Sequence, residues 1–164
     1  MLPLFVRRYL LTTLEGNPEV AIGLLSSLTE DDRRWDVRPF PERFTLREIV
    51  AHLADWETVF EERIRLPLEQ DRPSLPDVSV DVREKEQRYT ETNPLEALTR
   101  YRVHRGQLVE IVKTMNQDQW SRVAHFKRES ANIDEWVTIE AWLVQMVMHD
   151  GYHLRQLAEW LHDS

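Results

Sequence analysis

The chain has 164 residues, which suits a single domain large enough to bury an apolar core. Charged residues make up 30% of it and the net charge is -8, which disfavours a protein that binds nucleic acid through a basic surface. The absence of cysteine excludes disulfides, thiolate nucleophiles and cysteine-type zinc sites.

Targeting and membrane signals are weak. Two arginines interrupt the apolar start "MLPLFVRRYLLTTLEG", so we expect no signal peptide. No apolar run reaches the roughly 20 residues that a membrane-spanning helix needs, so we expect no membrane partner. A cytoplasmic protein is the resulting prediction.

The N-terminal part predicts a helix that is interrupted in its middle. Apolar residues recur at helical spacing over residues 3–28. Asn17 and Pro18 suit the N-cap and the first position of a new helix, so we expect a break there. A short helical turn over residues 28–35 and a proline-rich loop over residues 36–44 should follow.

The next helix carries a clear start signal. Thr45 and Glu48 have the spacing of a capping box, directly before an apolar stripe. We expect this helix to end before Pro67, because proline has no amide hydrogen to donate. A linker over residues 67–76 and a polar helix within residues 78–91 should lead away from it.

Two further long helices are predicted in the second half. Asn93 and Pro94 suit the N-cap and first position of a helix that runs to about Met115. A short turn and a loop should follow, and a last helix should run from Thr138 to about Leu161.

The element lengths predict an all-α fold. We expect an up-and-down bundle of four main helices with a long middle connection, as one domain over residues 1–164. The order helix, tryptophan-containing turn, loop and threonine-capped helix occurs twice. This echo fits a weak internal duplication and a chance resemblance of helical fragments equally well.

Three histidines fall on the flanks of apolar helix faces. His149 and His153 are one helical turn apart, so their side chains lie about 40° from each other on one face. His52 has a similar position beside the stripe of Ile49 and Phe60. Three imidazoles from two facing helices would form a site for one divalent ion, with other positions left for water or substrate. Histidines that only pack in the core explain the same spacing.

A metal-binding histidine needs a hydrogen-bond partner on its second ring nitrogen. The candidates close to the motif in sequence are Asp55, Glu57, Asp150 and Gln156. The remaining histidines have no comparable setting, and we place them outside the site: His104, His125 and His162.

The segments "FTLREIVAHLADWE" and "HDGYHLRQL" resemble the DinB / YfiT-like superfamily, and the resemblance covers nearly the whole chain. It implies a four-helix bundle, a homodimer, and a divalent metal ion held by His52, His149 and His153. Nickel or zinc are the metals that it favours, with manganese or iron as alternatives. Characterised members include thiol transferases that use mycothiol or bacillithiol, and a maleylpyruvate isomerase.

Three functions remain open from the sequence. The first is a metal-dependent S-transferase whose small-molecule partner is a low-molecular-weight thiol, because the chain has no cysteine of its own. The second is a metal-dependent hydrolase, in which the metal activates water. The third is a metal-binding or ligand-binding bundle without turnover. Arg155, the arginine nearest to the histidine pair, should point away from it, which gives no local support for a thiol clamp.

An apolar strip on the last helix suggests a subunit interface. Val144, Met148 and Tyr152 follow one another at helical spacing outside the main apolar face. We expect this strip to contribute to a homodimer.

Overall fold

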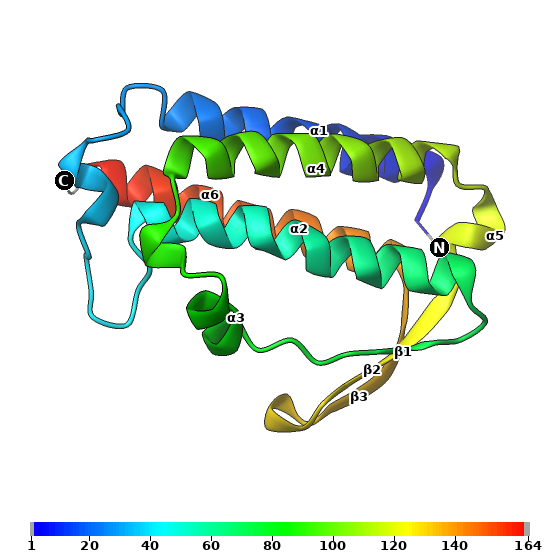
Figure 1. Ribbon diagram of the computed structural model, residues 1–164. Coiled ribbons are helices and arrows are strands. Elements are labelled where there is room, and N and C mark those ends of the chain that lie inside the picture. The colour runs from blue at the N-terminus through cyan, green and yellow to red at the C-terminus, as the bar shows by residue number, and fades with distance from the viewer. Residues whose placement is uncertain (1, 163–164) are drawn as a thin grey trace.

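Four long helices form the body of the protein in the computed structural model, which describes residues 2–162 (Figure 1). They are α1 (Leu4–Leu24), α2 (Leu46–Glu69), α4 (Pro94–Thr114) and α6 (Ile139–His162). Both α1 and α2 pack against α4 and α6, so α1 and α2 occupy diagonal positions. The predicted four-helix bundle is confirmed.

The long middle connection sets the directions of the helices. It leads from the end of α2 back along the bundle to the start of α4, so that these two helices run in the same direction (Figure 1). The direction reverses between α1 and α2 and again between α4 and α6, but not across this connection. The connection contains a short strand, a short helix and a 3-10 turn: β1 (Ser74–Leu75), α3 (Val80–Glu86) and Tyr89–Glu91.

A small sheet lies beside the bundle, where the sequence predicted only a loop. β2 (Val123–Arg128) and β3 (Ile133–Thr138) form an antiparallel hairpin, and β1 pairs with β2 in parallel. Asn132 closes the hairpin in the left-handed conformation, with φ of 52°. The prediction of a loop was wrong because only Ala124 and Phe126 are buried along β2 and β3, which leaves too short an alternating pattern to see. The remaining short elements are the 3-10 turns Arg33–Asp36 and Glu129–Ala131, and α5 (Gln117–Trp120).

The helix starts predicted at Thr45, Asn93 and Thr138 are confirmed. Thr45 accepts a hydrogen bond from the Glu48 amide, and the Glu48 carboxylate accepts one from the Thr45 amide, which completes the capping box. Asn93 caps α4 in front of Pro94. The Thr138 hydroxyl accepts a hydrogen bond from the Ala141 amide at the start of α6.

Both predicted proline breaks were wrong. α1 continues through Pro18, and α2 continues through Pro67 to its last turn. Pro18 cannot donate to the carbonyl of Leu14, one turn earlier, but the guanidinium of Arg105 donates to that carbonyl instead, over 3.1 Å. A contact from another helix therefore replaces the missing hydrogen bond of α1.

A layer of buried polar residues separates two apolar clusters in the core. Each long helix contributes one residue to this layer: Asn17 from α1, Glu57 from α2, Arg105 from α4 and Asp150 from α6. One apolar cluster lies on each side of this layer, and each cluster fills one end of the bundle. None of the helices among residues 2–162 combines the length and apolar content that crossing a lipid bilayer requires.

Candidate metal centre

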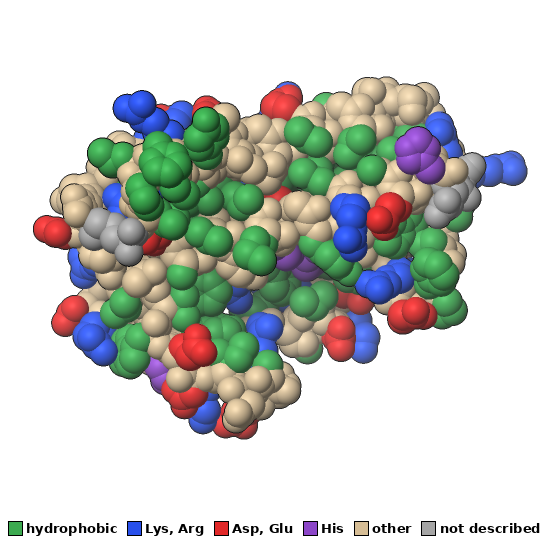
Figure 2. Space-filling model, turned by 180° about the vertical axis from the view of Figure 1, so that it is seen from behind, with side chains coloured by type: hydrophobic (Ala, Val, Ile, Leu, Met, Phe, Trp, Pro, Cys, Tyr) green, Lys and Arg blue, Asp and Glu red, His purple; other side chains and the backbone are tan. Residues whose placement is uncertain are grey.

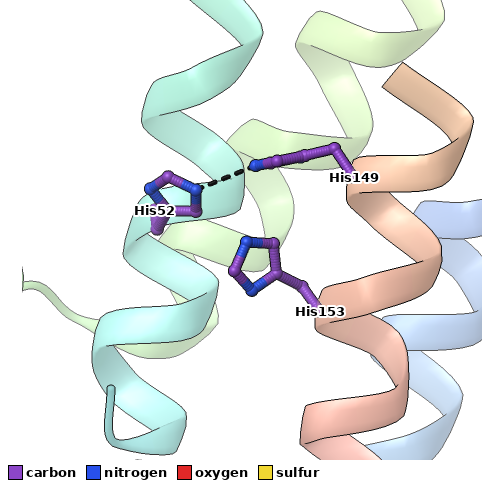
Figure 3. A group of neighbouring side chains, drawn as sticks. All are labelled: His52, His149 and His153. Atoms are coloured by element: carbon purple, nitrogen blue, oxygen red, sulfur yellow. Dashed lines mark hydrogen bonds between the residues drawn. The ribbon is translucent and has the colours of Figure 1, made fainter. Parts of the chain in front are cut away.

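The three histidines converge between α2 and α6. His52 projects from α2 toward His149 and His153, which lie on successive turns of α6 (Figure 3). The Nε2 atoms of His52 and His149 are 2.9 Å apart, and one ring nitrogen from each histidine lies within 4.8 Å of the others. Histidine nitrogens bind zinc at about 2.0–2.1 Å, so two ligands of one ion lie about 3 Å apart. The cluster therefore has the size that a shared ion needs.

The protonation state of the histidines also suits metal binding. Burial and the neighbouring imidazoles lower the pKa of His52 well below its usual value. Burial and His149 lower the pKa of His153 to about 4. These two rings are therefore neutral at pH 7, and a neutral imidazole has the lone pair that a metal ligand must supply.

Gln156 orients His153. Its Oε1 atom lies 2.7 Å from His153 Nδ1, so this nitrogen carries the proton and Nε2 is left to face the cluster. The Gln156 amide in turn donates to the Tyr152 hydroxyl over 3.2 Å, and Arg43 donates to the same hydroxyl over 2.7 Å. The sequence suggested four hydrogen-bond partners for the second ring nitrogen of a histidine ligand, and Gln156 is one that makes such a hydrogen bond.

We expect Gln156→Leu to weaken metal binding by about 10- to 100-fold, the usual effect of losing a contact that orients a ligand. Competition with a chromogenic chelator measures this affinity. Gln145→Leu is the matched control, because Gln145 lines the same pocket but is exposed and lies outside the histidine cluster. An unchanged affinity in Gln156→Leu would show that the hydrogen bond does not orient His153.

The nearby carboxylates are occupied elsewhere. Asp150 lies 3.8 Å from His149 Nδ1, which is too far for a hydrogen bond, and it accepts from Arg105 and Asn17. Burial raises the pKa of Asp150, but the contacts with His149, Arg105 and Asn17 outweigh it and hold this pKa at about 2. Asp150 is therefore ionised beside the cluster.

The other two suggested carboxylates do not contact the histidines. Asp55 faces away from the cluster and binds Arg83 and the Tyr89 hydroxyl, both from the middle connection. Glu57 forms a two-pronged ion pair with Arg105, over 2.6 and 3.0 Å. Burial raises the pKa of Glu57, while Arg105 opposes that shift.

A pocket of about 700 Å³ opens onto the cluster. The bundle forms one wall and the sheet forms the other, and Figure 2 shows the hollow between them with a histidine at its edge. Its lining includes all three histidines, the aromatic residues Trp56 and Trp142, and the sheet residue Phe126. None of the described residues that line it is a serine, threonine, lysine or cysteine. The hydroxyl, amine and thiol groups of these four residue types are therefore not available as nucleophiles at the pocket wall.

The remaining histidines lie outside the cluster, as predicted. His125 sits on the sheet and pairs with Asp134 over 2.7 Å. Arg155 is exposed and pairs with Glu159, so it points away from the histidines, which is also as predicted. Tyr152 lies outside the core, as predicted, with 42% exposure, and its hydroxyl also contacts Gln156 and Arg43 at the pocket.

Two buried arginines were missed from the sequence. Arg105 occupies the core face of α4, between Tyr101 and Leu108, and Arg63 lies on the face of α2 that carries His52. A polar residue at an apolar position of a helix was the signal that would have found both.

Comparison with known proteins gives a consistent picture. A search of curated protein sequences found no match. YfiT from Bacillus subtilis, described as a probable metal-dependent hydrolase with an unusual four-helix bundle topology, superposes with a TM-score of 0.87. The two share 20% identity, over 99% of this chain and 90% of that one. A mycothiol-dependent maleylpyruvate isomerase superposes with a TM-score of 0.71 and 18% identity, over 95% of this chain but 61% of that one.

At these identities the structural similarities establish a shared fold. The sequence itself supplies the family, since the model of the DinB superfamily matches residues 13–157. That match covers most of the bundle, including the segments that carry His52, His149 and His153. The chain therefore belongs to the DinB superfamily.

Proposed function

We propose that this protein is a divalent-metal-dependent enzyme that binds its ion through His52, His149 and His153, with nickel or zinc as the metal. The observation that carries the proposal is the position of the three imidazoles, which meet at the wall of a large pocket. Among residues 2–162 the cluster offers three protein ligands, which leaves positions on the ion for a substrate. Such an ion lowers the pKa of a bound thiol or water and polarises a bound carbonyl.

Thiol transfer is the reaction that the site supports best. The described residues that line the pocket include no serine, threonine, lysine or cysteine. Asp150 and Glu57, two carboxylates close to the histidines in the sequence, are both held by Arg105 and are not among the residues that line the pocket. A low-molecular-weight thiol loses its proton more easily than water does, because its ordinary pKa is far closer to neutrality. The mycothiol-dependent enzyme of similar fold supports the same choice.

Hydrolysis is the second candidate, and the description of YfiT favours it, since YfiT matches almost the whole chain. In that case His52, His149 and His153 would hold the ion in the same way, with water in place of the thiol. The pocket would then bind one substrate instead of two.

Cobalt substitution separates these candidates. We expect the cobalt-loaded protein to gain a thiolate-to-metal absorption band when mycothiol or bacillithiol is added, and to transfer that thiol to an electrophile. Metal binding without the band, together with metal-dependent cleavage of esters or amides, would replace the thiol reaction with hydrolysis. Metal binding with neither activity would leave a binding protein, and failure to bind cobalt, nickel or zinc would overturn the proposal as a whole.

A homodimer in the cytoplasm is part of the same proposal. Met148 on α6 is 70% exposed, and the start of the neighbouring α1 exposes Leu4, Phe5 and Tyr9. Figure 2 shows apolar side chains gathered on this side of the bundle. An exposed apolar group of this kind is typical of a subunit contact.

A further inference from the structure

Arg63 is a buried cation without a partner. The residue is 4% exposed and lines the pocket. Within residues 2–162 its guanidinium has no hydrogen bond or ion pair, and its Nε atom is fully covered and unbonded. A buried charge is costly unless it is paired, so an unpaired guanidinium at a pocket wall points to a partner that arrives with the ligand.

Aromatic rings hold the Arg63 guanidinium in place. Its Cζ atom lies 4.4 Å from the centre of the Trp142 ring, 5.4 Å from that of Phe126 and 5.6 Å from that of Phe60. These contacts stabilise the positive charge through the ring faces but leave the N–H groups unused. Burial and the nearby Arg128 lower the pKa of Arg63 to about 10, so it remains charged at pH 7.

The charges around Arg63 favour a ligand with a single negative charge. Arg128 also lines the pocket, but Asp77 pairs with it over 2.8 Å, whereas Asp77 and Glu62 act on Arg63 only from beyond ion-pair distance. The acidic residues Glu42, Asp81 and Glu135 also line the pocket and are exposed. They would repel a polyanion more strongly than a carboxylate.

Arg63 faces the histidines along the pocket. His52 and Arg63 are eleven residues apart on α2, which is three helical turns, so they share one face. On the antiparallel α6, Trp142 and His149 are two turns apart, or about 10 Å along the helix, and the guanidinium packs on Trp142. The lining between the two positions is largely apolar, with Trp56, Phe126 and Val137.

We propose that Arg63 binds the carboxylate of an elongated, partly apolar molecule whose reacting group reaches the histidine cluster. The planar guanidinium fork matches the two oxygens of a carboxylate. This assignment rests on the proposed function for what happens at the histidines, but the binding of the carboxylate is a separate property. The enzyme would therefore take a substrate or thiol with an apolar body and an acid group about 10 Å from the reacting atom.

Metal-free protein tests Arg63 without reference to catalysis. The probes are octanoate and the neutral octanol, followed through tryptophan fluorescence, because Trp142 contacts Arg63. We expect octanoate to bind the parent about 10- to 100-fold more tightly than octanol, the usual worth of a hydrogen bond to a charged group. Arg63→Met should remove this preference, and Arg63→Lys, which keeps the charge but not the fork, should retain part of it.

Arg65→Met is the matched control, because Arg65 is an exposed residue on the same helix and pairs with Glu61. It should keep the full preference for octanoate. A parent without this preference, or an Arg63→Met variant that retains it, would overturn the proposal. Tighter binding of octylphosphonate than of octanoate would overturn the choice of a carboxylate. If Arg63→Met does not fold, the reduced preference of Arg63→Lys decides the question.

Cobalt-loaded protein distinguishes failure of this inference from failure of the proposed function. Mercaptooctanoate should give the thiolate-to-metal band at a lower concentration than mercaptooctanol, and Arg63→Met should make the two equal. Equal binding in the parent would reject the role of Arg63 and leave the metal chemistry standing. Absence of cobalt binding, together with a clear preference for octanoate in the metal-free protein, would reject the metal chemistry and leave the role of Arg63 standing.

Discussion

Replacing His149 with alanine is expected to abolish stoichiometric metal binding and to leave the helical bundle folded. His149 supplies one of the three converging ring nitrogens, so its removal leaves two ligands on separate helices. The loss of affinity should exceed the roughly 10- to 100-fold that loss of an outer contact costs. His149 lies at the pocket wall rather than in an apolar cluster, so the core should tolerate the change.

Mass spectrometry of the bound metal, after reconstitution with zinc, nickel and manganese, measures this result, with circular dichroism as the test of folding. His125→Ala is the control, because His125 pairs with Asp134 on the sheet, away from the cluster. It should bind as much metal as the parent. A folded His149→Ala variant with one ion per chain would show that the three histidines are not the site.

The same circular dichroism measurement, made on metal-free protein, distinguishes a catalytic metal ion from one that is needed for folding. The polar layer and two apolar clusters give this bundle a core that does not depend on the histidines. We therefore expect metal-free protein to retain its helical content, with the bound ion adding only the stabilisation that its affinity dictates. A protein that unfolds without metal would instead have a structural site.

The helix starts at Thr45, Asn93 and Thr138 and the helix faces of the histidines could be predicted because both depend on local patterns. That the three rings meet was an expectation that the family resemblance strengthened. The capping box of Thr45 and Glu48 uses residues three apart, and the faces of His52 and His149 follow from the helical repeat. The proline at position 18 misled the prediction because the partner of the Leu14 carbonyl comes from Arg105, 91 residues away. Such a replacement leaves no local signal.

Side-chain partners from other elements could not be predicted in the same way. Asp55 is three residues from His52 but is held by Arg83 and Tyr89 of the middle connection. The sheet that completes the pocket has few buried residues, although it places Phe126 against Trp142 and Arg63. The helix faces of the three histidines are thus visible from helix periodicity, while the shape of the pocket depends on contacts between distant segments.

Replacing Arg105 with methionine is expected to destabilise the protein by about 3–5 kcal/mol, the usual cost of removing one partner from a buried ion pair. Arg105 is 1% exposed and binds both Glu57 and Asp150, so the variant would bury two carboxylates without their cation. Urea denaturation measures the free energy of unfolding. Arg102→Met, an exposed change on the same helix, should stay within about 0.5 kcal/mol of the parent.

The pH dependence of Arg105→Met identifies the cause of its instability. Without the guanidinium, burial should raise the pKa of Glu57 further above its unfolded value, so the folded variant takes up a proton more readily than the unfolded chain. A raised pKa stabilises the folded state at low pH, and that contribution is lost as pH rises through the folded value. The difference in the free energy of unfolding between variant and parent should therefore be smaller at pH 5 than at pH 8. Adding Glu57→Gln to the variant should reduce this difference at pH 8. A gap that does not change with pH would mean that lost packing around Arg105, rather than an unpaired carboxylate, destabilises the layer beside the histidines.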